Sequence, residues 1–178
     1  MNTKQSYPSL PLLVCLIAVL LFAPGFGVAQ TGPHAEKVKT SMDLLRSGAG
    51  KLGIPRVEGA DTVAGKEVAA IYFGNTKINN NFELVDDVVN QNGGIATIFV
   101  KSGNDYVRIA TNVKNDDGSR AIGTVLDPKG QVFVNIRNNK PFYGEAIILG
   151  KPYISRYEPI RDAANRVVGI YHIGFPKE

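Results

Sequence analysis

The chain has 178 residues, of which 44% are hydrophobic and 20% are charged, and its formal net charge is +4. This is the composition of an ordinary globular domain, and it excludes a disordered or fibrous chain. A single cysteine excludes an intramolecular disulfide and a cysteine-cluster zinc site, and no run of lysine and arginine indicates a nucleic-acid partner.

The N-terminus has the pattern of an export signal. Residues 10–23 form a nearly pure apolar run that follows Lys4. A helix of this length rises about 21 Å, which is too short for the hydrocarbon core of a membrane. Gly27 and Ala29 place small residues where a signal peptidase would cleave. We therefore predict a signal peptide over residues 1–29 and an exported mature protein; a retained membrane anchor is the alternative.

A helix and a connector are expected next, over residues 30–62. Pro33 suits the first position of a helix, and the apolar residues that follow it recur on one stripe. Gly48 and Gly50 predict that the helix stops at that point. The proline- and glycine-rich residues 51–62 are predicted as an irregular connector. The members of the apolar stripe are Ala35, Val38, Met42 and Leu45.

Short helices and extended segments alternate in the middle of the chain. Residues 68–73 predict a buried strand, and residues 82–91 predict a helix that Gly93 helps to end. Two segments rich in β-branched residues, 95–100 and 106–113, predict a hairpin because turn-forming residues separate them.

The last third begins with an extended segment at 121–126, followed by a helix that we expect Asp127 to cap. Strands are predicted at 142–149, 153–160 and 167–175, and the links between them are too short for parallel neighbours. The sum is an α+β fold, with a five- to six-stranded antiparallel sheet, a long N-terminal helix and short inserted helices.

The chain lacks the motifs of the common catalytic classes. No GxSxG, P-loop or HExxH motif is present, and cleavage of the signal peptide would remove the only cysteine. His172 alternates with apolar residues in the last predicted strand, where we expect a half-buried structural histidine. Asp86 and Asp87 are adjacent, so they would not face each other on a helix. We therefore predict no enzyme, no metal site and no cofactor.

Arginine and tyrosine residues in the sheet remain as candidates for binding. Arg108 lies in mid-strand between two apolar residues, where a cation needs a partner or an anionic ligand. Tyr153 and Tyr157 share one face of a later strand. A bidentate cation with several hydroxyl donors is the chemistry of a small carboxylate site. Structural ion pairs and core tyrosines are the alternative explanation.

From Val63 to the end, the chain carries a series of short motifs whose order and spacing resemble the single Cache domain, in particular its Cache 3/Cache 2 fusion subgroup. The motifs are FELVD (82–86), GIATIF (94–99), VRIATN (107–112), DGSRAIGT (117–124), YG (143–144), LGKPYI (149–154), YEPIRD (157–162) and VGIY (168–171). The single Cache domain is the extracytoplasmic sensor module of bacterial chemoreceptors and histidine kinases. We accordingly place the ligand-binding domain at residues 63–178.

The resemblance implies a PAS-like fold with a pocket for a small metabolite, often an organic acid, on one face of the sheet. On a regular strand Arg108 and Thr111 point to opposite faces, so both reach that pocket only if a bulge or a strand end intervenes. Carried over by motif, six residues become candidate ligand contacts: Arg108, Thr111, Arg120, Tyr143, Tyr153 and Tyr157.

The sequence stops just past the last predicted strand, without the second membrane span and output domain of a receptor. We therefore expect a stand-alone bacterial protein, periplasmic or secreted, that binds a small carboxylate and relays it to a membrane receptor or transporter in signal transduction or chemotaxis. The alternative is an interaction protein with a vestigial pocket, which docks on an envelope partner through its N-terminal helix. Neither function involves nucleic acid, and we expect the protein to contact the membrane only through its signal peptide, before cleavage.

Overall fold

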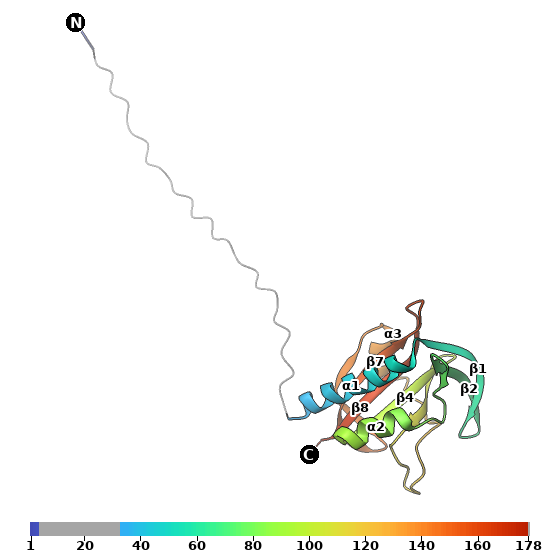
Figure 1. The fold of residues 1–178 in the computed structure, drawn as a ribbon. Coiled ribbons are helices and arrows are strands. Elements are labelled where there is room, and N and C mark those ends of the chain that lie inside the picture. The colour runs from blue at the N-terminus through green and yellow to red at the C-terminus, as the bar shows by residue number, and fades with distance from the viewer. Residues whose placement is uncertain (4–32, 178) are drawn as a thin grey trace. The chain divides into compact units, whose positions relative to one another are not determined.

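The computed structural model of the protein describes residues 1–3 and 33–177 (Figure 1). The predicted signal peptide falls almost entirely in residues 4–32, outside the described residues, so it stays a prediction. No helix in the described part of the chain is both long and apolar enough to cross a membrane.

Two antiparallel sheets form the fold, which confirms the predicted α+β class. The larger sheet has five strands in the order β5-β4-β8-β7-β6, and the smaller has three in the order β1-β2-β3. Three helices accompany them in the described residues. The elements are α1 (Pro33–Leu52), β1 (Pro55–Val63), β2 (Lys66–Phe73), β3 (Thr76–Lys77), α2 (Glu83–Asn92), β4 (Ile95–Ser102), β5 (Asp105–Thr111), α3 (Gln131–Arg137), β6 (Phe142–Ile148), β7 (Lys151–Arg161) and β8 (Val167–Pro176).

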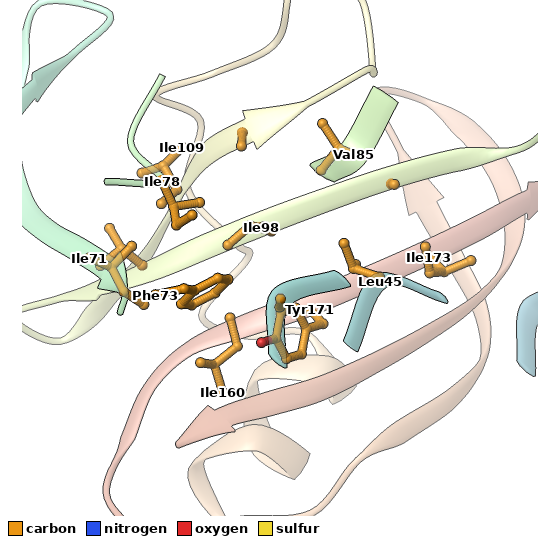
Figure 2. Packing of buried hydrophobic residues seen from close by; sticks show 14 of the residues in the cluster. Leu45, Ile71, Phe73, Ile78, Val85, Ile98, Ile109, Ile160, Tyr171 and Ile173 are labelled. Atoms are coloured by element: carbon orange, nitrogen blue, oxygen red, sulfur yellow. The ribbon is translucent and has the colours of Figure 1, made fainter. Parts of the chain in front are cut away.

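One face of the five-stranded sheet packs against α1 and α2, and we call it the helix face (Figure 1). The predicted stripe of α1 supplies Val38, Met42 and Leu45, which are almost completely buried. Ile98 of β4 and Ile173 of β8 belong to the same apolar cluster (Figure 2). An amphipathic helix laid on alternating strand residues is therefore the main source of stability on this face.

The glycines of α1 predicted that the helix stops at Gly48. In the structure it continues to Leu52. Ala49 extends the buried stripe by one turn. A Cβ added at Gly48 would lie 3.0 Å from the Leu84 side chain on α2, so the missing side chain lets the two helices approach closely. Tertiary packing thus outweighs the low helix propensity of glycine, which costs only about 1 kcal/mol per residue.

Strand β1 replaces the irregular connector expected over residues 51–62. It pairs with β2 along its whole length, and the register shifts between Val57 and Ala60. Gly59 lies in that shift with φ +72°, a conformation that glycine adopts without strain. A bulge therefore absorbs the residue that made the segment look irregular in sequence.

The opposite face, which we call the cavity face, packs against α3 and the segment that precedes it. Its apolar cluster includes Phe99, Tyr106, Phe133 and Tyr157. The extended segment predicted at 121–126 closes the outer edge of β5 through backbone hydrogen bonds, although it forms no regular strand.

Helix α3 begins at Gln131, later than the expected start at Asp127. The Asp127 side chain accepts the backbone N–H of Lys129 at 2.9 Å, and it therefore stabilises a turn rather than the first turn of a helix.

Candidate functional site

A cavity of about 380 Å³ opens on the cavity face, between β5, β6, β7 and the segment that leads into α3. This volume lies within the usual range for small-molecule sites. Its lining residues are Arg108, Thr124, Val125, Leu126, Asp127, Gly130, Gln131, Val132, Phe142, Glu145, Ala146, Ile147, Ile148, Leu149 and Tyr157.

Arg108 supplies a buried guanidinium to this cavity, since the residue is only 7% exposed. Its Nη1 donates to Thr124 Oγ1 at 2.9 Å and to the Ala121 carbonyl at 3.5 Å. Its Nε is buried without an acceptor, and no described residue accepts a hydrogen bond from Nη2. Nε and Nη2 therefore have no acceptor among the described residues; Nε is fully covered by the protein, whereas Nη2 is not.

No carboxylate of the described residues compensates the Arg108 charge. Burial lowers the pKa of Arg108, although a guanidinium stays protonated at physiological pH. The guanidinium carbon lies 5.3 Å from the centre of the Phe99 ring, whose face stabilises a cation. An aromatic ring and two oxygen acceptors thus replace the ion pair that a buried arginine usually has.

A bulge brings Arg108 to the cavity face. Ile98 pairs with Ala110 while Phe99 pairs with Arg108, so Ile109 is the extra residue of β5. The bulge shifts the alternation of side chains by one residue, and Arg108 and Thr111 therefore share a face. The sequence analysis required such a bulge for both residues to face one pocket. Thr111 nevertheless lies outside the cavity lining.

Tyr157 forms part of the cavity wall in front of a fully buried histidine. The rings of Tyr157 and His172 stack with centres 4.0 Å apart, and His172 Nε2 lies 3.3 Å from Ser155 Oγ. Burial raises the pKa of the Tyr157 phenol. Burial, and secondarily the Arg108 charge, lowers the pKa of His172 well below its usual value. Both rings are therefore neutral at pH 7, and His172 is more deeply buried than predicted.

The other candidate contacts lie outside the cavity lining, so the structure brings only Arg108 and Tyr157 together there. Thr111 Oγ1 is 2.7 Å from Thr97 Oγ1, and it also donates to the Ala96 carbonyl at 3.2 Å. Tyr143 packs against the apolar cluster of the helix face. Tyr153 lines a separate hollow of about 210 Å³.

Arg120 forms a bidentate ion pair with Asp86 of α2, with distances of 2.7 and 2.8 Å. Its Nη1 also donates to the Thr111 carbonyl at 2.7 Å, and its guanidinium carbon lies 4.2 Å from the centre of the Phe82 ring. These contacts tie the loop after β5 to α2. Ligand contact by any of the six residues stays a prediction.

The sequence analysis did not select the residues that hold Arg108 or form the apolar wall. Thr124 occurs in one of the quoted motifs, and its hydroxyl both accepts from Arg108 and donates to the Ala121 carbonyl at 2.9 Å. Val132 and Ile148 belong to the apolar cluster of the cavity face. Nothing in the sequence indicated a cavity beside them.

A larger hollow of about 700 Å³ is lined by Lys101, Tyr106 and Arg137, among others. None of the buried side-chain atoms that lack a partner belongs to its lining in the described residues. The described part of the chain also contains no group of three or more metal-ligating side chains. The unpartnered cation therefore favours the smaller cavity as the binding site.

The model of the family described as the Cache 3/Cache 2 fusion domain matches residues 34–178. This match confirms the resemblance drawn from the sequence motifs. Domains of this kind are extracytoplasmic sensor modules for small molecules, and they are sensory rather than catalytic. A search of the curated proteins found no match to this sequence.

Proposed function

The chain belongs to the Cache 3/Cache 2 fusion domain family, and from this premise we propose that it binds a small organic carboxylate in the cavity beside Arg108. One observation carries the proposal: the buried Arg108 has an Nη2 group without an acceptor and no carboxylate partner in the described residues. A ligand carboxylate would supply the missing partner through a charge-assisted hydrogen bond to Nη2.

The surroundings of Arg108 make it a suitable anchor. Thr124 and the Phe99 ring hold the guanidinium in place, so little side-chain entropy would be lost when a ligand binds. Tyr157 adds a neutral phenol to the wall, which can donate a hydrogen bond without changing the charge of the cavity. The positive charge would thus be concentrated at one buried point.

We further propose that the protein is exported and presents the bound ligand to a membrane receptor or transporter in signal transduction or chemotaxis, without catalysing a reaction. The apolar run at residues 10–23 and the sensory character of the family support this role. The alternative docking function drew on the apolar stripe of α1. That stripe is buried against the sheet and α2, so the core accounts for it.

The test is a thermal-shift comparison of matched carboxylates and amides on the purified protein: acetate with acetamide, and hexanoate with hexanamide. A ligand at about 100 times its Kd adds about 2.7 kcal/mol, which raises Tm by several degrees in a domain of this size. We expect the carboxylates to raise Tm and the amides to have no effect. Equal shifts for both members of each pair, or no shift for either, would contradict the proposal.

A further inference from the structure

The charges around the cavity are arranged for one anionic group. Arg108 is the only cation among the lining residues that the structure describes. Asp127 is exposed, and its carboxylate accepts the Lys129 N–H of its own turn. The Glu145 carboxylate lies 2.5 Å from Lys177 Nζ, so that partner already occupies it. A second carboxylate on the ligand would be desolvated without a cation to pair with it.

Most of the remaining wall is apolar. Ala146 and Ile148 share the face of Phe142 by the alternation of β6, and Val132 is the buried first-turn residue of α3. These side chains belong to or pack against the apolar cluster of the cavity face, as does Leu126. An anion the size of acetate would leave this wall uncovered, whereas an aliphatic chain would fill the cavity against it.

The apolar lining continues to the surface at Leu149, which is 47% exposed, and at Val125, which is 43% exposed. Leu149 and Gly150 form the two-residue link between β6 and β7, with φ +45° and +80°. Such a turn favours asparagine before the glycine, since leucine is strained at positive φ. An exposed leucine in a strained position at the edge of a cavity points to a role in binding.

We infer, building on the proposed function, that the ligand is an aliphatic monocarboxylate of medium chain length. Its carboxylate pairs with Nη2 of Arg108, and its chain runs along the apolar wall to Leu149 and Val125. This assignment sets the selectivity of the cavity: dicarboxylates are rejected because a second cation is missing, and very short acids bind weakly because they leave the wall uncovered.

The first test is calorimetry on the purified protein with acetate, butanoate, hexanoate, octanoate and the eight-carbon dicarboxylate suberate. We expect the affinity to rise by about fourfold for each added methylene. Octanoate and suberate have the same chain length, so their comparison isolates the second charge. Suberate should bind more than about tenfold more weakly than octanoate.

The second test is Leu149→Asn, which supplies the residue that the turn favours and removes the apolar side chain. We expect Tm to be unchanged or higher, the affinity for octanoate to fall by about tenfold, and the affinity for acetate to stay constant. Ile54→Asn is the matched control, because Ile54 is 65% exposed and does not line the cavity. Octanoate should bind that variant as tightly as the original protein.

The outcomes separate this inference from the proposed function. Tightest binding by acetate or suberate, or octanoate binding that Leu149→Asn leaves unchanged, would overturn the aliphatic assignment and leave a carboxylate site intact. Failure of every carboxylate to bind a folded protein would overturn both.

Discussion

The two faces of the five-stranded sheet are made from the same strands but treat their buried polar groups differently. On the helix face, Ser41 of α1 accepts a hydrogen bond from the Asn92 amide of α2 at 2.8 Å. On the cavity face, Arg108 Nε and His172 Nδ1 are buried without partners among the described residues. Thr97 and Thr111 on the cavity face do bond each other, so the unpartnered atoms there are confined to Arg108 and His172, beside the cavity wall.

The largest loss of stability should come from a substitution on the helix face. Leu45→Ala removes a fully buried side chain between α1 and the sheet, and we expect it to cost about 3–5 kcal/mol of unfolding free energy. Leu52→Ala near the end of the same helix, where the side chain is 37% exposed, should cost less than about 0.5 kcal/mol. Urea denaturation measures both values.

Neither leucine lines the cavity, so carboxylate affinity should be the same in both variants at temperatures where they are folded. Loss of binding in folded Leu45→Ala protein would show that the two faces are not independent.

A smaller effect should come from the Arg120–Asp86 pair, which joins the loop after β5 to α2. Both side chains are partly exposed, so we expect Arg120→Gln to cost about 1 kcal/mol in stability. A double-mutant cycle with Asp86→Asn should recover most of that amount as coupling energy. Carboxylate affinity should not change. A large loss of affinity in Arg120→Gln would restore this residue to the site that the sequence analysis proposed.

The smallest effect is a pH dependence of stability from the cavity face. Burial lowers the pKa of His172 in the folded protein, so its neutral form is favoured there while the unfolded chain takes up a proton near pH 6.5. This stabilisation is complete above pH 6.5 and is lost as the pH falls. We expect it to lower the unfolding free energy by about 1 kcal/mol between pH 6.5 and 5.5.

His172→Gln should remove this part of the pH dependence, whatever its effect on stability at pH 7. Urea denaturation at the two pH values measures the difference. An unchanged pH dependence in the variant would mean that other groups cause it.

The regular elements were predictable because alternation and turn residues are local signals. β6, β7 and β8 lie close to their predicted ranges for this reason. The end of α1 and the strand β1 were not predictable from the sequence, because each depends on a partner that is distant in sequence. Gly48 lies in a helix where α1 approaches Leu84 of α2 closely, and Gly59 lies in a strand at a bulge.

The site was predictable to a lesser degree. A cation in mid-strand made Arg108 a candidate, the shared face of β7 made Tyr157 another, and both line the cavity. Arg120 carried the same chemical signal, but its partner Asp86 comes from a helix 34 residues earlier, and no local pattern shows that contact. Tyr143 and Phe142 are adjacent in β6 and face opposite ways, so the choice between them depends on which face holds the cavity.

The central claim is that Arg108 is kept for a ligand rather than for the fold. Arg108→Met tests it most directly, with Arg137→Met on the exposed end of α3 as the control. The measurement is hexanoate affinity by calorimetry, together with Tm in the absence of ligand. We predict that Arg108→Met loses about 100-fold in affinity while its Tm is unchanged or higher, because an uncompensated buried charge is removed. A marked fall in Tm with hexanoate binding retained would show that Arg108 is structural and would contradict the account.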